Sequence, residues 1–381
     1  MTNVLQLHAS AGLYGGESVI LALSNALRNR RVHPTVGCVA MAGREPPGLA
    51  AKAAEYGLDV ECFPMGGART VSVIARINRV VRNRKIALIH AHGYKSNLLG
   101  AIAARMNRIP MVTTNHLYPM MPLNDRKLQL YGRFDVRITA RFIDMIVAVS
   151  EDIRGRIIGQ GVDEKKVMVI ENGIDVAAFA HAPGTDVREF RLSLGIPDGA
   201  FVVGSLARLT PQKGQRYLLE AAARVLSAGV AAHVLIAGDG PLRQELTQYA
   251  EELGIAGSVS FLGFRRDTLA LLRAMDVFVL SSIDEGLPMA MLEAMAARVP
   301  VVTTRVGDVP KAIADRHNGM LVEPRDSAAL ADALLYLAGN DKERARFAAN
   351  AHDTVVRDYS QESMCDKYLA VYRRLLPPQP V

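Results

Sequence analysis

Half of the 381 residues are hydrophobic, so the chain can bury the cores of two domains of ordinary size. No apolar run reaches the roughly 18 residues that a membrane-spanning helix needs, and the start, MTNVLQLHAS, lacks the charged segment of a secretory signal. The three scattered cysteines, Cys38, Cys62 and Cys365, match neither a disulfide framework nor a metal-ligand spacing, so we expect a reduced, cytoplasmic protein.

The net charge of +7 is spread unevenly along the chain. Residues 1–180 hold 23 Lys and Arg against 14 Asp and Glu, whereas residues 181–381 hold 22 against 24. A basic surface on the first half favours an anionic partner, such as a phospholipid face or a polyphosphate. We expect no nucleic acid, because the basic tracts lack interleaved aromatic side chains and contain no recognised nucleic-acid module.

Short apolar strands alternate with amphipathic helices along both halves, which is typical of parallel sheets built from βαβ units. Residues 179–198 interrupt this rhythm with Pro, Gly and charged side chains. We therefore predict a first domain over 1–180, a second over 181–357, and a C-terminal part over 358–381 that holds a helix and a Pro-rich tail. The predicted strands lie near 4–9, 35–40, 60–65, 87–92, 111–116, 145–150, 167–172, 201–207, 232–238, 259–264, 277–282, 299–304 and 319–322.

A glycine pair precedes the first helix of the first domain. Gly15 and Gly16 allow close backbone approach, and the N–H groups beside them could meet an anion. The spacing matches neither the dinucleotide fingerprint nor a P-loop, so by itself the pair favours an ordinary tight turn over an anion site.

Histidines end two predicted strands of the first domain. His90 and His92 alternate on one strand, and His116 ends the next. A pair at i and i+2 can bind a metal, but no third ligand or Asp-x-Asp motif accompanies it, so we expect no metal and no other cofactor. His116 is the better candidate for a catalytic contact, because a histidine at a strand end can stabilise charge that develops on a substrate.

Two basic helical segments follow in the same domain. Residues 69–85 place Ile74, Ile77 and Val81 on one face and several arginines elsewhere, and residues 125–142 carry five cations. Either both segments pack their apolar stripe on the sheet and solvate their charges, or they lie against an anionic membrane.

In the second domain, Arg208 and Lys213 follow the first strand within the segment ARLTPQKG. Two cations at the end of a buried strand could neutralise a diphosphate, Arg as a planar fork and Lys as a point charge. Solvated surface cations are the alternative. The segments AGDGP and FLGF end two further strands and could hold a nucleoside or form simple turns.

Two glutamates eight residues apart, Glu285 and Glu293, flank the start of a short predicted helix whose first turn would contain Pro288. Helix N-termini attract anions, so two acids there call for an explanation. Glu285 could cap the helix and Glu293 could be a surface acid. Because Glu293 has apolar neighbours on both sides, we favour a hydroxyl-rich ligand held between the two carboxylates.

The order and spacing of these motifs resemble the retaining glycosyltransferases of family 4. The resemblance is carried over nearly the full length by GLYGGE, HAHG, VTTNH, ENGID, ARLTPQKG, AGDGP, FLGF and EGLPMAMLE. It implies the GT-B fold, in which two Rossmann-like α/β domains face each other across a cleft, and a C-terminal helix that crosses back to pack on the N-terminal domain.

The resemblance also implies residue roles. Arg208 and Lys213 would bind the donor diphosphate, Glu285 the hydroxyls of the transferred sugar, and Glu293 the ribose. The turn at 263–265 would face the base, and Gly16 would approach the phosphates or the acceptor. The implied catalytic residues are His116 and Glu285, and the implied donor-binding residues are Gly16, Arg208, Lys213, Gly263, Phe264, Arg265, Gly286, Leu287, Met289 and Glu293.

By this resemblance, the chain would be a retaining, metal-independent hexosyltransferase. It would move a hexose from a UDP- or GDP-sugar to a lipid-linked or polysaccharide-precursor acceptor. We expect it in the cytoplasm, with an anionic membrane surface as a partner on the inner face of the cytoplasmic membrane. The alternatives are a nucleotide-sugar 2-epimerase of the same fold and a catalytically inactive nucleotide-sugar-binding protein.

Overall fold

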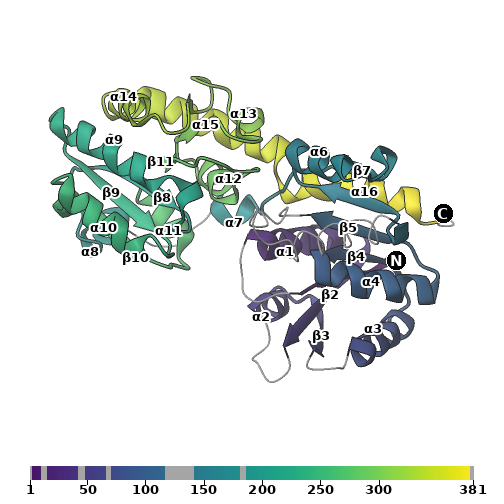
Figure 1. The fold of residues 1–381 in the computed structure, drawn as a ribbon. Helices are drawn as coiled ribbons and strands as arrows, with labels where there is room; N and C mark the ends of the chain where they lie inside the picture. Colours follow the sequence, from purple (N-terminus) through teal and green to yellow (C-terminus); the bar gives the residue numbers. More distant parts are fainter. Residues whose placement is uncertain are drawn as a thin grey trace. The chain divides into compact units, whose positions relative to one another are not determined.

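The computed structural model describes residues 2–9, 15–41, 48–65, 70–115, 141–180 and 186–377. The chain divides into two compact units. Unit 1 consists of residues 1–174 and 361–381, and unit 2 of residues 175–360. Each unit is built on one parallel sheet with helices on both of its faces (Figure 1), as predicted for Rossmann-like domains.

The sheet of unit 1 has seven strands in the order β3-β2-β1-β4-β5-β6-β7. Its strands are β1 (Thr2–His8), β2 (Val32–Met41), β3 (Asp59–Met65), β4 (Ile86–His92), β5 (Met111–Asn115), β6 (Met145–Ala148) and β7 (Val167–Val169). Its helices are α1 (Gly15–Arg28), α2 (Gly48–Glu55), α3 (Thr70–Asn83), α4 (Tyr94–Asn107), α6 (Glu151–Gly159), the short η1 (Glu164–Lys166) and α16 (Gln361–Leu375).

Side chains alternate across the sheet of unit 1, as strand geometry requires. Leu5 and Leu7 of β1 pack with the buried residues of α3 and α4 on one face. Val36 and Cys38 of β2 pack with the buried residues of α1 and α2. In α3, Ile77 and Val81 are buried in the first of these cores, so the apolar stripe of this basic helix packs on the sheet.

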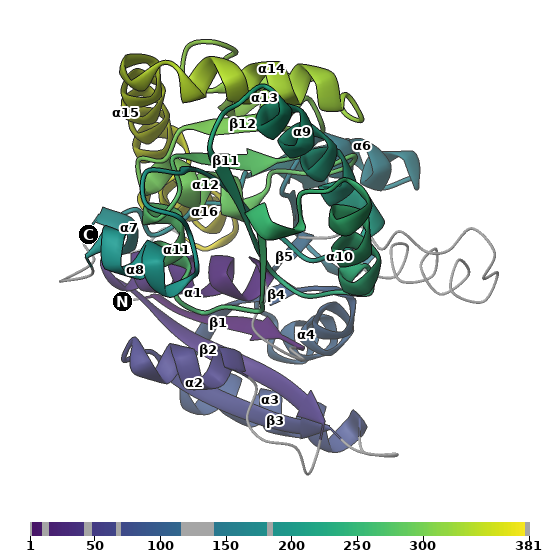
Figure 2. The ribbon, with the colours of Figure 1, turned by 90° about the vertical axis from the view of Figure 1, so that its left-hand side faces the viewer.

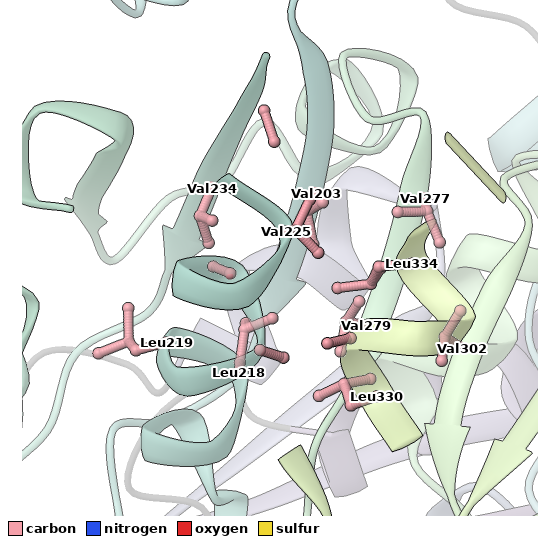
Figure 3. Packing of buried hydrophobic residues seen from close by; sticks show 14 of the residues in the cluster. Val203, Leu218, Leu219, Val225, Val234, Val277, Val279, Val302, Leu330 and Leu334 are labelled. Carbon is pink, nitrogen blue, oxygen red and sulfur yellow. The ribbon is translucent and has the colours of Figure 1, made fainter. Parts of the chain in front are cut away.

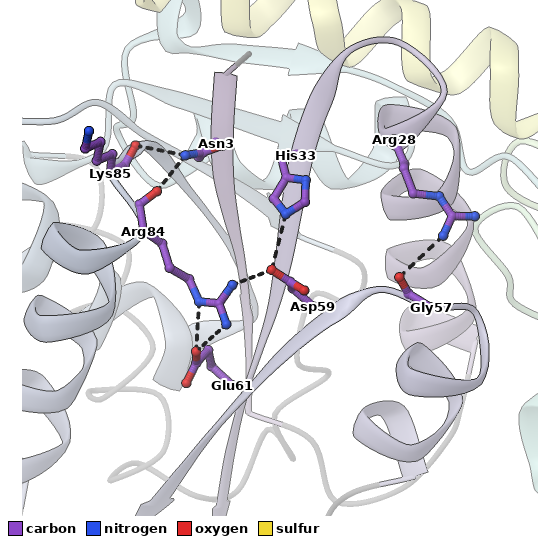
Figure 4. A network of polar contacts seen from close by, with 8 residues as sticks. All are labelled: Asn3, Arg28, His33, Gly57, Asp59, Glu61, Arg84 and Lys85. Atoms are coloured by element: carbon purple, nitrogen blue, oxygen red, sulfur yellow. Dashed lines mark hydrogen bonds and ion pairs between the residues drawn. The ribbon is translucent and has the colours of Figure 1, made fainter.

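A polar network joins the amino ends of the strands in unit 1 (Figure 4). Arg84, just after α3, donates to Glu61 at 2.8 Å and contacts Asp59, both on β3. The Asn3 side chain of β1 donates to the Arg84 carbonyl at 2.6 Å. One arginine of the basic segment is therefore neutralised inside unit 1.

The C-terminal helix α16 belongs to unit 1, where it packs against α1. Its Tyr368 hydroxyl lies 2.8 Å from Thr114 Oγ1 of β5, and its Tyr372 hydroxyl lies 2.7 Å from His90 Nδ1 of β4. These are buried contacts with the sheet, so the prediction that this helix packs on the N-terminal domain agrees with the structure.

The sheet of unit 2 has six strands in the order β10-β9-β8-β11-β12-β13. Its strands are β8 (Phe201–Leu206), β9 (Ala232–Ala237), β10 (Val259–Gly263), β11 (Val277–Leu280), β12 (Val301–Thr304) and β13 (Met320–Val322). Its helices are α7 (Ala177–Ala180), α8 (Val187–Ser193), η2 (Pro211–Lys213), α9 (Gln215–Ser227), α10 (Arg243–Glu252), η3 (Ala256–Ser258), α11 (Thr268–Arg273), α12 (Met289–Ala296), α13 (Val309–Ala312), α14 (Ser327–Ala338) and α15 (Asp341–Asp358).

The main core of unit 2 lies between its sheet and the helices α9 and α14, which pack against each other (Figure 2). Leucines of the two helices meet valines of four strands (Figure 3). The labelled members are Leu218, Leu219 and Val225 of α9, Leu330 and Leu334 of α14, and Val203, Val234, Val277, Val279 and Val302 of the strands. This rigid core fixes the strand ends that carry the candidate site.

Each of the thirteen predicted strands appears in the structure, but the unit boundaries differ from the predicted ones. Unit 2 begins at Asp175 rather than at residue 181, because α7 packs on α12 of that unit. Unit 1 resumes at Gln361 rather than at residue 358, because α15 continues to Asp358. The Gln361 N–H donates to the Ile174 carbonyl at 2.7 Å, so the two crossings between the units lie side by side. Within the described ranges, no helix is long and apolar enough to cross a membrane.

Candidate functional site

The strand order of unit 2 places the ends of β8 and β11 next to each other. From β8 the chain proceeds outward to β9 and β10, and it then returns to the other side of β8 with β11. Ligands of open parallel sheets bind outside the carboxyl ends of the strands at such a topological switch point. The segment 207–214 follows β8 and the segment 281–288 follows β11, so the structure brings the two predicted motifs together here.

Lys213 and Glu285 form an ion pair at this switch point. Lys213 Nζ contacts Glu285 Oε1, and the Ser282 hydroxyl donates to the same oxygen at 2.7 Å. The two charged side chains are only 16% and 10% exposed. The sequence predicts separate ligand groups for them, whereas the structure pairs them directly.

The interpretation of Glu285 as a helix cap is wrong, because its carboxylate is held by Lys213 and Ser282. The N-cap of α12 is Pro288, one residue before the first turn, and no described side chain caps the helix. The first N–H groups of α12, beginning with Met289, therefore have no intrahelical acceptor. Together with the helix dipole they favour an anion near Gly286 and Leu287, where the loop meets the helix.

Two glycines let the loops of the site pack backbone against backbone. Gly214 has φ +61°, and a Cβ there would lie 2.2 Å from the Ser281 carbonyl oxygen. Gly307, with φ +48°, follows β12, and a Cβ there would lie 2.0 Å from the Glu285 carbonyl oxygen. The Glu285 loop is therefore clamped from both neighbouring strands, and larger residues at either glycine would displace it.

Hydroxyl groups add a second clamp that sequence reasoning missed. Thr304, the last residue of β12, donates to the Ser282 carbonyl at 2.6 Å, and the Ser281 hydroxyl donates to the Lys213 carbonyl at 3.2 Å. Asp308 N–H donates to the Gly286 carbonyl at 3.1 Å. The only sequence signal for these roles is a hydroxyl residue at or just after the end of each strand.

Glu293 lies on α12, where burial raises the pKa of its carboxyl group to about 7. Its carboxylate has no hydrogen-bond or ion-pair partner among the described residues. The interpretation of Glu293 as a solvated surface acid is therefore wrong. A shielded carboxylate without a partner is costly, and the hydroxyls of a ligand could satisfy it.

Arg208 is exposed, and its guanidinium has no partner in the described part of the chain. Its backbone is fixed, because the Gln215 side chain donates to the Arg208 carbonyl at 2.9 Å. The site therefore holds one free cation, Arg208, and one paired cation, Lys213.

The turn that ends β10 presents an aromatic ring to solvent. Gly263 has φ +67°, and the Phe264 side chain that follows it is 68% exposed. Arg265 is engaged by Asp267, with Nε donating to Oδ1 at 2.8 Å, and this bond lowers the pKa of the Asp267 carboxyl. The exposed ring is thus free to stack on a planar group, while the Arg265 charge is largely satisfied.

In unit 1, Gly16 lies in the first turn of α1, and His116 lies outside the described residues. His90 and His92 are buried and bound to neighbouring side chains, His90 to Tyr372 and Thr114 and His92 to Gln6. Across the described ranges, no group of three or more metal-ligating side chains is found. The basic segment 125–142 lies almost wholly outside the described residues.

Comparison with known proteins supports the resemblance that the motifs indicate. The family model of "Glycosyltransferase Family 4" matches residues 14–178, and that of "Glycosyl transferases group 1" matches residues 186–354. The chain is 32% identical over 306 residues to the D-inositol 3-phosphate glycosyltransferase of Corynebacterium urealyticum, a match that covers 76% of this chain and 71% of that one. It is 28% identical over 317 residues to an Escherichia coli UDP-Gal:alpha-D-GlcNAc-diphosphoundecaprenol alpha-1,3-galactosyltransferase, covering 82% and 81%.

Among solved structures, HepE of Anabaena in complex with UDP-glucose matches with a TM-score of 0.83 at 25% identity, over 98% of this chain and 100% of that one. The two parallel-sheet units thus have the architecture of GT-B proteins. The chain belongs to family 4 of the glycosyltransferases and is a glycosyltransferase.

Proposed function

We propose that the protein transfers a hexose from a nucleotide-diphosphate sugar, with retention of the anomeric configuration and without a metal. The observation that carries the proposal is the switch point of unit 2, where the Lys213–Glu285 pair joins the segments that follow β8 and β11. The free cation Arg208 lies in the first of these segments, and the unpartnered carboxylate of Glu293 lies on α12, the helix that follows the second. HepE, whose structure matches this chain with a TM-score of 0.83, forms a complex with UDP-glucose. This complex supports a UDP-sugar as the donor.

Donor binding would rearrange the Lys213–Glu285 pair. A diphosphate would bind Arg208 and Lys213, and the N–H groups at the start of α12 would add further donors. Glu285, released from Lys213, would then accept hydrogen bonds from the sugar hydroxyls. Glu293 would meet the ribose hydroxyls, and Phe264 would lie against the base.

These groups suggest how the reaction would proceed. Two cations and a helix N-terminus could stabilise the charge on the departing diphosphate without a metal. Retention requires that the acceptor attack the face of the sugar from which the phosphate leaves. The departing phosphate oxygen would then take the proton of the acceptor hydroxyl. His116 stays our candidate for a contact at the reacting carbon.

The acceptor is proposed to be lipid-linked or a polysaccharide precursor. The Escherichia coli relative is named for a diphosphoundecaprenol acceptor, and a Rhizobium meliloti relative, 34% identical over 244 residues, is named for lipopolysaccharide core biosynthesis. An acceptor held in a bilayer would require the enzyme to work at a membrane surface.

The surface of α3 and α4 suits an anionic membrane. Residues 62–124 contain nine Lys and Arg and no Asp or Glu. Along α4, the apolar side chains Leu98, Ile102 and Met106 recur every four residues and are 48%, 36% and 57% exposed. An apolar stripe among exposed cations is typical of helices that lie in a membrane interface, and we propose peripheral binding to the inner face of the cytoplasmic membrane.

A donor screen followed by product analysis tests this function. We expect one UDP- or GDP-hexose to raise Tm more than the others, since a ligand of the native state stabilises it by mass action. With that donor and N-acetylglucosaminyl-diphosphoundecaprenol or alkyl glycosides as acceptors, UDP or GDP should be released with formation of an α-linked product. A β-linked product would contradict retention, activity lost with EDTA would contradict metal independence, and C2 epimerisation without acceptor would favour the epimerase.

A further inference from the structure

Arg243, the first residue of α10, lies beside the turn that ends β10. The turn has room for it because Gly263 has no side chain: a Cβ there would lie 3.0 Å from Arg243 Nη1. Arg243 Nη2 also donates to the Phe261 carbonyl of β10 at 3.3 Å. The guanidinium therefore lies against the same turn that presents the exposed ring of Phe264.

Most of the hydrogen-bonding capacity of this guanidinium is unused. A guanidinium has five N–H donors, and the described part of the chain engages that of Arg243 by the one bond to Phe261. The carboxylate of Asp239 lies 4.0 Å from Arg243 Nη1, at the outer limit of an ion pair, and is itself 61% exposed. The Arg243 side chain is 45% exposed, so a ligand at the turn can reach its free N–H groups.

The loop that follows β9 joins two parts of the candidate site by backbone contacts. On one side, Leu209 N–H donates to the Asp239 carbonyl at 3.0 Å. On the other side, Gly238 N–H donates to the Gly263 carbonyl at 2.8 Å. A Cβ at Gly238 would lie 1.9 Å from the Ala207 carbonyl oxygen, so the loop packs directly on the segment that follows β8. This loop, the AGDGP segment, therefore sets the distance between that segment and the turn that ends β10.

The spacing of the strands suits a nucleotide. Arg208 follows β8, and the turn ends β10, two strands away in the order β10-β9-β8. Leu206 and Gly263 are both in register with Ala237 of β9, so the two strands end at the same level. Neighbouring strands lie about 4.8 Å apart, so the two positions are roughly 10 Å apart along the edge of the sheet. With the diphosphate at Arg208, a ribose can bridge this distance and bring the base to the turn.

We propose that Arg243 selects donors whose base has a carbonyl group at the edge that faces the turn, as in uracil and guanine. Adenine and cytosine have an exocyclic amino group in the same place. A guanidinium only donates, so it can bond to the carbonyl oxygen but not to the amino group. The Phe264 ring can stack on any base and does not discriminate, because every base has a π-face. The donor is therefore a UDP- or GDP-sugar and not a CDP- or ADP-sugar.

This inference rests on the proposed function, in which the diphosphate of the donor binds Arg208. Calorimetry with nucleoside diphosphates tests it, since such binding needs neither the sugar nor the acceptor. UDP and CDP differ by a carbonyl against an amino group on the base, and so do inosine diphosphate and ADP. We expect the carbonyl member of each pair to bind the wild type at least about tenfold more tightly, as for a good contact between arginine and a base.

Two outcomes with the wild type separate the inference from the proposed function. Equal or tighter binding of the amino member in both pairs would overturn the inference and leave the transfer of a hexose intact. Absence of binding by all of these nucleoside diphosphates would instead overturn the proposed function, and the inference with it. Both outcomes can be read without any variant.

Arg243→Gln tests whether the preference comes from this side chain. A glutamine amide both donates and accepts, and it pairs with adenine, whereas arginine pairs with a carbonyl base. We expect the affinity ratios of UDP to CDP and of inosine diphosphate to ADP to fall by about tenfold. The control is Arg224→Gln, at an exposed arginine of α9, which should keep the wild-type ratios. Lower affinity with unchanged ratios in Arg243→Gln would show that Arg243 supplies only charge or structure, and would overturn the inference.

Discussion

The two units have sheets of related strand order, and each places a charge pair at its switch point, but the pairs differ in kind. Unit 2 pairs Lys213 with Glu285, and the free cation Arg208 lies in the same segment as Lys213. Unit 1 pairs His8 with Glu17, and His8 is also held by the carbonyl of His92, whose ring contacts Gln6. The same backbone architecture thus carries two different charge pairs, because the loops and not the sheet supply the chemistry.

The two pairs are also held by different means. In unit 2 the loops contact each other through backbone atoms at Gly214 and Gly307. In unit 1 the support is a layer of buried side chains that reaches α16 through Tyr372. A substitution at Gly214 or Gly307 should move the donor loops. A substitution at Tyr372 should instead act on His8 through the His92 carbonyl.

The largest effect is expected for Glu285→Gln. It removes the charge that we assign to the transferred sugar, so kcat should fall by about 10²- to 10³-fold. The affinity for UDP, which lacks that sugar, should stay the same or rise, because Lys213 is released from its partner. Calorimetry with UDP and steady-state kinetics check this. Full activity would show that the pair of unit 2 is only structural.

Arg208→Ala should weaken UDP binding by about 10- to 100-fold, since a charge-assisted bond to phosphate contributes about 1.5–3 kcal/mol. Arg216→Ala is the control, because Arg216 lies in the first turn of α9 but is engaged by Glu220 and Tyr249. Calorimetry should show nearly wild-type affinity for that variant. Equal losses in both variants would mean that general surface charge, and not the switch point, attracts the nucleotide.

Glu293 predicts a pH dependence that only unit 2 should show. Its pKa is raised to about 7, so its contribution to stability is fully present below pH 4.5 and is lost as pH rises through 7. As pH rises from 5 to 8, the free energy of unfolding of Glu293→Gln should therefore increase relative to that of the wild type, by up to about 2–3 kcal/mol. Its Tm relative to the wild type should rise over the same range. A constant difference in Tm would show that the carboxyl group is solvated.

The same group should influence nucleotide affinity. If ionised Glu293 accepts from the ribose hydroxyls, UDP should bind several-fold more tightly at pH 8 than at pH 6 in the wild type. In Glu293→Gln only the pH dependence that comes from ionisation of UDP itself should remain. Parallel curves for the two proteins would exclude the ribose contact.

The smallest effects concern the basic surface of unit 1. Sedimentation with vesicles containing phosphatidylserine should show binding that weakens with salt, and each of Arg76→Ala and Arg79→Ala should lower it by about fivefold, near 1 kcal/mol per cation. Leu98→Ser with Met106→Ser should weaken binding without changing its salt dependence. Lys342→Ala, on α15 of unit 2, is the control. Equal binding to neutral vesicles would contradict an electrostatic contribution.

The sequence by itself determined the strands, the order of the motifs and the side of the sheet on which they end. Apolar strands of a parallel sheet are continuous in sequence, and Gly, Pro and charged residues mark where they stop, so local composition carries this information. The positions of Arg208, Lys213 and Glu285 after β8 and β11 follow from that pattern.

Only the tertiary structure decided what these residues contact. The ion pair joins Lys213 to Glu285 across 72 positions in the sequence. No local pattern shows that Lys213 and Ser282 both contact the same carboxylate oxygen of Glu285. The partial burial of Glu293, the burial of His90 and His92 beneath α16 and the His8–Glu17 pair have the same origin. Each depends on which distant elements pack together, because burial and hydrogen bonding are set by neighbours in space and not by neighbours in sequence.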